Sequence, residues 1–177
     1  VEENLPLRYE GKWTAPFSAC DVDTGQGDPF STYMYGVLMS EVAVDTTTGK
    51  TQVEKMTIVS DCGTIVNKLV LEGQIYGGLV QGIGLALSED FEDLKKHTTL
   101  TGCGIPQIKD APDNIVIIHQ ETPRPHGPYG ASGVGEMPLS APHASIINAI
   151  YDACGVRVKH LPAYPEKVLA GLKELNK

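Results

Sequence analysis

The strongest constraint on how this chain folds is a glycine-rich run at residues 127–136, Gly-Pro-Tyr-Gly-Ala-Ser-Gly-Val-Gly-Glu. Four of its ten residues are glycine, which loses more backbone entropy on ordering than any other residue. The run is therefore predicted to form a loop, and neither a helix nor a central strand. Because few side chains shield its amides, such a loop can approach an oxygen-rich ligand closely.

A helix start is predicted directly after this loop. Ser140 is expected to be the N-cap, Pro142 to lie in the first turn, and residues 144–153 to continue as helix up to a cap at Gly155. Glu136 ends the glycine run just ahead of that helix. A carboxylate held there is a candidate catalytic base, but it could equally be a solvated loop glutamate, which bare composition favours.

The second informative stretch spans residues 69–87. Apolar residues at positions 71, 75, 79 and 83 form a helical stripe, yet glycine occupies positions 73, 77, 78, 82 and 84. A helix this rich in glycine makes sense only if its backbone lies tight against another backbone or a bulky cofactor. Gln74 and Gln81 lie two turns apart and share a face, so they are candidate ligand contacts or, more simply, surface residues.

The remaining segments predict the fold class. Two β-branched stretches, residues 35–45 and 51–61, flank a short turn with glycine and form a β-hairpin with one packed and one wet face. Residues 114–121 form a compact apolar strand, and residues 166–175 an amphipathic helix. Together these segments predict an α/β (α+β) fold, with a mixed sheet that contains the hairpin and carries packed helices.

Composition narrows the function. The formal net charge of −8 over 177 residues argues against nucleic acid and anionic membranes as partners, and no apolar run reaches transmembrane length. With no export signal, the cytoplasm is the expected location. No protein ligand to a metal is predicted, and the four scattered thiols are expected to be buried and reduced: Cys20, Cys62, Cys103 and Cys154.

The N-terminal region is predicted to be irregular. Residues 1–16 are interpreted as a surface connector with a short strand near residues 12–14. Residues 21–30 lack the spacing and closing glutamate of a calcium-binding EF-hand. They are predicted to form an Asp-rich turn with Gly25 and Gly27 at positive φ.

Two motifs together resemble a known family. The string Gly-Pro-Tyr-Gly-Ala-Ser-Gly-Val-Gly-Glu-Met-Pro-Leu and the string Glu-Gly-Gln-x-x-Gly-Gly-x-x-Gln-Gly-x-Gly, about sixty residues earlier, are similar to segments of the xanthine oxidase/aldehyde oxidoreductase family, the molybdenum hydroxylases. The similarity is greatest to bacterial members that carry molybdopterin cytosine dinucleotide. The chain departs from the family at Lys68, where proline often follows the asparagine, and at Ser132, where many relatives have lysine.

This resemblance implies an activity and a set of site residues. Glu136 would be the general base beside the molybdenum in the oxidation of aldehydes to carboxylic acids with water as the oxygen source. The cofactor would be molybdopterin cytosine dinucleotide with molybdenum, whose metal is held by the pterin. [2Fe-2S] clusters are expected outside this chain. Because Ser132 replaces a lysine, backbone is expected to make the loop contacts. The implied cofactor contacts are Gln74, Ala131, Ser132, Gly133, Val134 and Gly135.

The resemblance also implies that the chain is incomplete. Matching segments come at the end of a much longer polypeptide, so residues 17–160 are interpreted as the C-terminal portion of a larger molybdenum-cofactor-binding domain, followed by a linker and helix at residues 161–177. The expected partners are the remainder of the enzyme, a second copy in a homodimer, and an aldehyde or related small molecule. The alternative is a non-catalytic cofactor-binding or scaffold module that has lost the rest of the enzyme.

Overall fold

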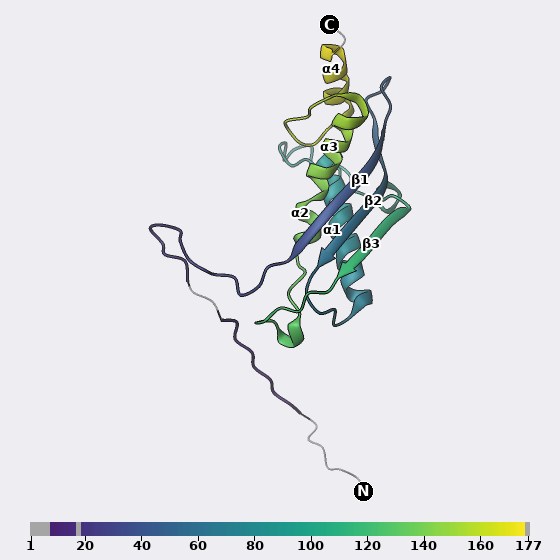
Figure 1. Ribbon diagram of the computed structural model, residues 1–177. Coiled ribbons are helices and arrows are strands. Elements are labelled where there is room, and N and C mark those ends of the chain that lie inside the picture. Colours follow the sequence, from purple (N-terminus) through teal and green to yellow (C-terminus); the bar gives the residue numbers. More distant parts are fainter. Residues whose placement is uncertain (1–7, 17–18, 176–177) are drawn as a thin grey trace.

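The computed structural model describes residues 8–16 and 19–175, and the part from residue 35 onward folds around one mixed sheet (Figure 1). Strands β1 (Tyr35–Val44) and β2 (Thr51–Asp61) pair antiparallel, and β3 (Asn114–Gln120) pairs parallel to β2, in the order β1-β2-β3. The predicted α/β (α+β) class and the hairpin are confirmed. Since β2 and β3 run in parallel, their carboxyl ends lie at the same edge of the sheet.

The hairpin alternates as expected. Val42 and Val44 pack against the core, whereas Glu41, which precedes Val42, is exposed. The turn is closed by a backbone hydrogen bond from the Asp45 amide to the Lys50 carbonyl at 2.9 Å. The alternation fixes the register, because a shift of one residue would turn the apolar side chains outward.

Helices cover one face of the sheet. Helix α1 (Lys68–Leu87) and α3 (Pro142–Cys154) pack there, with the short α2 (Met137–Ser140) leading into α3, and α4 (Pro165–Leu175) closes the chain beyond the hairpin turn (Figure 1). Two short 3-10 helices, η1 (Ile108–Asp110) and η2 (Pro128–Gly130), lie in the connections.

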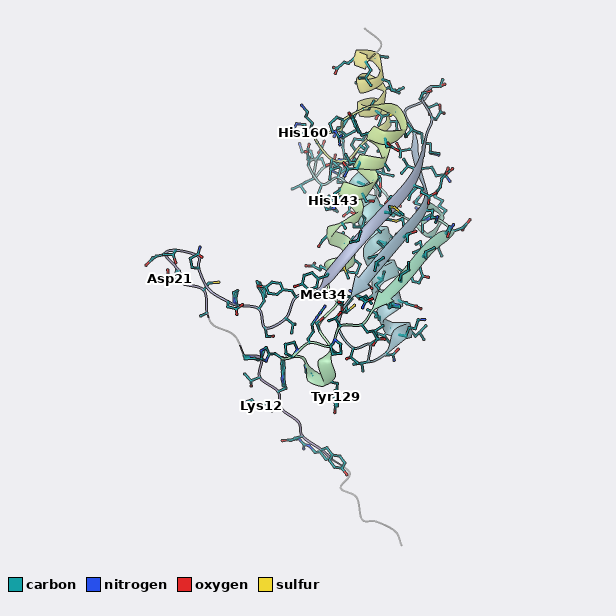
Figure 2. All side chains as sticks on the ribbon, in the orientation of Figure 1. Lys12, Asp21, Met34, Tyr129, His143 and His160 are labelled. Atoms are coloured by element: carbon teal, nitrogen blue, oxygen red, sulfur yellow. The ribbon has the colours of Figure 1, made fainter. Side chains whose placement is uncertain are left out.

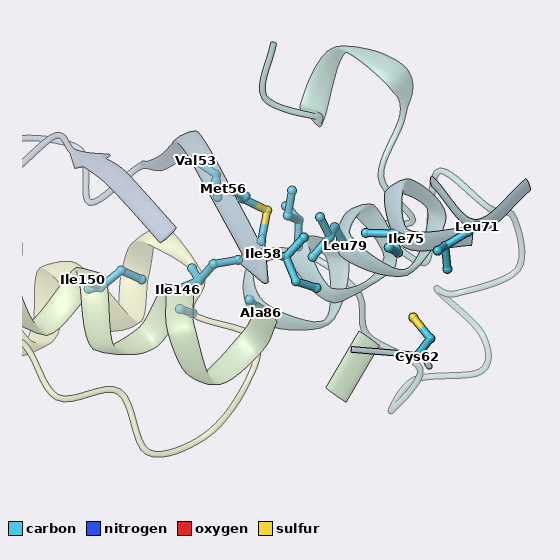
Figure 3. Close-up of a cluster of buried hydrophobic side chains, with 12 residues drawn as sticks. Val53, Met56, Ile58, Cys62, Leu71, Ile75, Leu79, Ala86, Ile146 and Ile150 are labelled. Atoms are coloured by element: carbon cyan, nitrogen blue, oxygen red, sulfur yellow. The ribbon is translucent and has the colours of Figure 1, made fainter. Parts of the chain in front are cut away.

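The core lies between β2, α1 and α3 (Figure 3). The predicted apolar stripe of α1 is confirmed, because Leu71, Ile75, Leu79 and Ile83 are all buried. Full burial of one such side chain contributes about 1.5–3 kcal/mol. The buried partners on the other elements include Val53, Met56 and Ile58 of β2 and Ile146 and Ile150 of α3.

The glycines of α1 allow close helix packing. A methyl group added at Gly78 would lie 2.6 Å from Cβ of Pro138, and one added at Gly82 would lie 2.5 Å from Cβ of Pro142. The prediction that the helix lies tight against another part of the chain is therefore confirmed on this side. On the other side, Gly73 and Gly77 face open space.

The start of α3 differs from the prediction. Ser140 is not an N-cap: it ends α2, and its hydroxyl donates to the carbonyl of Glu136 at 3.1 Å. The helix begins at Pro142, and Ala141 precedes it without a side-chain cap. Packing of the prolines on α1 outweighs the usual preference of a serine for the cap position. The predicted cap at Gly155 is confirmed, with φ at +76°.

The N-terminal region also corrects two predictions. Residues 12–14 form no strand, and the described part of residues 8–34 extends away from the body, as Lys12 and Asp21 in Figure 2 show. The Asp-rich turn is confirmed, since Asp21 Oδ1 accepts the amide of Thr24 at 2.7 Å, and Gly25 has φ +67°. Gly27 is not at positive φ. It is glycine because an added Cβ would lie 2.7 Å from the backbone of Cys20.

The expected burial is confirmed for two of the four cysteines. All four are free thiols, with Cys62 and Cys103 buried and Cys154 half-buried, but Cys20 is exposed on the extended segment, contrary to the prediction. None of the helices in the described part of the chain is long and apolar enough to cross a membrane.

Candidate functional site

Two loops meet at the carboxyl ends of the parallel strands β2 and β3. The amide of Thr64, in the loop after β2, donates to the carbonyl of Gly130 at 3.0 Å. The amide and the hydroxyl of Ser132 both donate to the carbonyl of Cys62, each at 2.9 Å. This edge of a parallel pair is where open α/β sheets place their ligands.

A cavity of about 440 Å³ lies between these loops and the start of α1. Its lining includes five of the six cofactor contacts that the sequence predicts. Gly133 is not among the lining residues, and neither is Glu136. The predicted residues that the structure brings together are Gln74, Ala131, Ser132, Val134 and Gly135.

Gln74 joins the two predicted motifs directly. Its side-chain Nε2 donates to the carbonyl of Gly135 at 2.8 Å, across 61 positions of sequence. The start of α1 is fixed nearby, because the side chain of Asn67 accepts the amide of Val70 at 3.1 Å as an N-cap. Gln81 does not line this cavity. Of the two glutamines on this face of α1, only Gln74, the one that the resemblance implies, lies at the cavity.

Glu136 follows directly after the lining residue Gly135. Its carbonyl accepts the amide of Leu139 at 3.0 Å and so begins α2, while its side chain makes no capping hydrogen bond. The residue is exposed. Its neighbours Val134 and Met137 are half-buried and pack against the core. The carboxylate therefore lies on a loop that is fixed on both sides by the packing of Val134 and Met137.

The backbone of the glycine loop is open to a ligand. A Cβ added at Gly133 or Gly135 would meet no atom within 4 Å. Among the described residues, no three His, Cys, Asp or Glu side chains are grouped so as to hold a metal ion. A pterin cofactor that carries its metal fits these residues, since the uncrowded backbone at Gly133 and Gly135 and the carboxamide of Gln74 suit its polar heterocycle and phosphate oxygens.

Cys62 forms the buried wall of the cavity. Burial raises the pKa of its thiol, although a hydrogen bond with Ser60 acts in the opposite direction. A neutral thiol is therefore expected there at neutral pH, and the side chain behaves as a small apolar wall.

Part of the lining was not predicted from the sequence. Residues 62–67 were expected only to be a loop, yet most of them line the cavity with Val70 and Leu71 of α1. The available signal was their place after a strand and before a glycine-rich helix, with Asn67 as the cap. The parallel pairing of β2 and β3, which brings both loops together, was not foreseen.

A larger cavity of about 860 Å³ lies at the other end of the sheet, lined mainly by residues 50–54 and 104–114. It contains none of the predicted site residues. The smaller cavity is the better candidate despite its lower volume, because Gln74 and most of the predicted loop residues line it.

The chain is thus a mixed α/β domain with a cavity at the carboxyl ends of two parallel strands, lined in part by a glycine-rich loop and the side chain of Gln74. The molybdopterin cofactor-binding domain family matches the chain over residues 1–112. The chain belongs to this family.

The relatives are larger enzymes. The aldehyde oxidoreductase of Megalodesulfovibrio gigas is 60% identical over 169 residues, covering 95% of this chain and 19% of that protein. The crystal structure of the Desulfovibrio desulfuricans aldehyde oxidoreductase superposes with a TM-score of 0.89 at 67% identity, over 94% of this chain and 18% of the other.

A more distant structure shares the fold. Quinoline 2-oxidoreductase from Pseudomonas putida gives a TM-score of 0.69 at 37% identity, over 75% of this chain and 18% of that one. The chain spans about a fifth of the length of the relatives it matches. The resemblance to molybdenum hydroxylases, and among them to aldehyde oxidoreductases, is confirmed.

Proposed function

We propose that this chain forms one wall of the molybdenum cofactor site of an aldehyde-oxidising molybdenum hydroxylase and supplies Glu136 as its general base. The observation that carries the proposal is the contact of Gln74 with Gly135, which joins the two sequence motifs at a single cavity. Similarity to aldehyde oxidoreductases over most of the chain supports the choice of substrate.

The proposed cofactor is molybdopterin cytosine dinucleotide. Gln74 has two N–H donors and an acceptor, so its bond to Gly135 leaves other positions for the cofactor. The loop from Ala131 to Gly135 would bind through its backbone, as the open surroundings of Gly133 and Gly135 allow. The amide and the hydroxyl of Ser132 both donate to the carbonyl of Cys62, so its contact with the cofactor would have to use the rest of its backbone.

When bound, the cofactor would supply the redox-active metal that oxidises an aldehyde to a carboxylic acid with water as the oxygen source. This chain would then handle the proton. The carboxylate of Glu136 would accept it from the attacking water, and general-base catalysis of this kind is worth about 10²–10⁴-fold. Val134 and Met137, packed on either side, would help to keep bulk water from the base.

The remainder of the enzyme would complete the site. Glu136 is exposed in this chain, so other parts of the polypeptide would have to cover it and shape the aldehyde pocket. We propose that [2Fe-2S] clusters outside this chain receive the electrons and that the enzyme is a cytoplasmic homodimer. The resemblance to the molybdenum hydroxylases supports the clusters and the homodimer.

The test is Glu136→Gln in the purified holoenzyme. We expect the variant to keep its molybdenum and to lose turnover of an aldehyde by about 10²–10⁴-fold, since only the proton acceptor is removed. Glu174→Gln, the same change at an exposed residue of α4, is the control and should leave turnover unchanged. Turnover of the Glu136 variant within a few fold of wild type would refute the assignment.

The second candidate is a non-catalytic cofactor-binding or scaffold module. The observation that favours it is the position of Glu136, which is exposed and does not line the cavity. Such a module would bind the cofactor through Gln74 and the glycine loop alone. Cofactor binding by the natively purified protein, with no turnover of an aldehyde, would support it.

A further inference from the structure

An ion pair joins the ends of the two parallel strands. Asp61 is the last residue of β2, and Arg124 lies in the loop that follows β3. The guanidinium Nη2 of Arg124 donates to the backbone carbonyl of Asp61 at 2.8 Å and lies 3.0 Å from its carboxylate Oδ1. Both side chains are largely buried, with exposed fractions of 9% for Arg124 and 15% for Asp61. We call this pair the Asp61–Arg124 clasp.

The clasp reaches into both loops of the candidate site. Asp61 Oδ1 also accepts the amide of Gly63 at 3.0 Å and that of Thr122 at 3.2 Å, so one carboxylate oxygen holds the first residues of each loop. The amide of Arg124 donates to the carbonyl of Gly130 at 2.8 Å. That same oxygen accepts the amide of Thr64, so the glycine loop is tied to the clasp and to the loop after β2.

The chemistry of the pair suits a rigid link. Burial acts to raise the pKa of Asp61, but hydrogen bonds with Thr122 and Gly63 and the charge of Arg124 outweigh it, so this pKa lies below its usual range. The carboxylate is therefore ionised at neutral pH. The guanidinium lies over the ring of Tyr35, 5.4 Å from its centroid, which further restricts its position. Lysine could not reproduce this planar, stacked arrangement.

We propose that Asp61 and Arg124 are positioning residues of the candidate site. They set the spacing between residues 62–67 and the glycine loop, and hence the width of the cavity into which the cofactor would fit. Neither residue lines the cavity, so they act through the loops that they hold. This inference rests on the proposed function for what the cavity binds, but the geometry of the clasp does not depend on it.

The test is Arg124→Ala in the holoenzyme, measured with and without added guanidinium ion. The first readout is amide hydrogen exchange at Thr64 and Ser132, and the second is the rate at which molybdenum is lost during dialysis. Loss of the charge-assisted bonds should speed both by roughly tenfold. Guanidinium at low, non-denaturing concentration should restore both rates toward wild type by filling the vacated place.

Guanidinium separates positioning from general stability. If Arg124 merely contributed to stability, the added denaturant would make the variant exchange faster, not slower. Arg157→Ala is the matched control, because Arg157 also stacks over a tyrosine, at 3.7 Å from the ring centroid of Tyr151, and bonds to Asn148 far from the loops. It should alter neither readout. If Arg124→Ala does not fold, Arg124→Lys is measured instead and should speed exchange severalfold without rescue.

The two readouts also separate the clasp from the proposed function. Absence of molybdenum from the natively purified wild-type enzyme would refute the proposed function. The exchange measurement would still decide whether the clasp holds the loops. Exchange within twofold of wild type in Arg124→Ala would overturn the clasp. Faster exchange with unchanged molybdenum retention would show that the clasp orders the loops but does not position a cofactor site.

Discussion

The packing of α1 against α3 can be tested by adding one methyl group at Gly82. This glycine is buried where the helix meets Pro142, and the new Cβ would lie 2.5 Å from Cβ and 2.6 Å from Cγ of that proline. Pro142 is itself fully buried and has a rigid ring, so it cannot rotate away. Gly77 lies on the same helix and is the matched control, because a Cβ added there would meet no atom within 4 Å.

The expected effects have opposite signs. Replacing a helical glycine with alanine stabilises by about 0.4–1 kcal/mol where the site is open, because the unfolded chain loses conformational freedom. Overpacking costs about 1–3 kcal/mol. Gly77→Ala should therefore raise the free energy of unfolding by about 0.4–1 kcal/mol. Gly82→Ala should lower the free energy of unfolding by about 0.5–2 kcal/mol, because the overpacking cost exceeds the gain from the restricted unfolded chain.

Urea unfolding of the chain, followed by circular dichroism, measures both variants. The midpoint should rise for Gly77→Ala and fall for Gly82→Ala, with the slope unchanged, since a changed slope would indicate a change in exposed surface. A stabilised Gly82→Ala variant would show that α1 and α3 do not approach as closely as described. The reasoning about the glycine-rich helix would then be wrong.

Two further predictions concern titration and reactivity. Burial, with a hydrogen bond to Asp90, raises the pKa of Tyr164 to about 12. The unfolded state releases its proton nearer pH 10, so this contribution to stability is present below about pH 10 and is lost as the pH rises towards 12. In Tyr164→Phe the free energy of unfolding should fall less between pH 10 and 12 than in the wild type. The same fall with pH in both proteins would contradict the assignment. Among the thiols, exposed Cys20 should react with iodoacetamide at least about tenfold faster than Cys62, which is buried with a raised pKa, and equal rates in the folded protein would show that Cys62 is accessible.

The hairpin and the buried face of α1 could be predicted from short-range sequence patterns. The hairpin follows from alternating β-branched residues around a turn, and the stripe from Leu71 to Ile83 predicts which face of α1 is buried. Ser140 shows the limit. Its residue type favours a cap, but the packing of Pro138 and Pro142 on Gly78 and Gly82 decides where the helices begin. Tertiary contact overrode local preference there.

The candidate site was likewise predicted only in part. Resemblance indicated Gln74 and the loop from Ala131 to Gly135, and all of these except Gly133 line one cavity. The contribution of residues 62–67 and the Asp61–Arg124 clasp could not be predicted. Both depend on the parallel pairing of β2 with β3, which brings together residues about sixty positions apart. No short-range pattern records that pairing.

If this chain forms part of a molybdenum cofactor site, it should carry molybdenum when isolated with its natural partners. The most direct test is the molybdenum content per chain of protein purified natively, under conditions that preserve any associated polypeptide. We expect close to one molybdenum atom per chain, released together with a pterin. Freshly isolated, folded protein that contains no molybdenum would contradict it and leave Glu136 a solvated loop carboxylate.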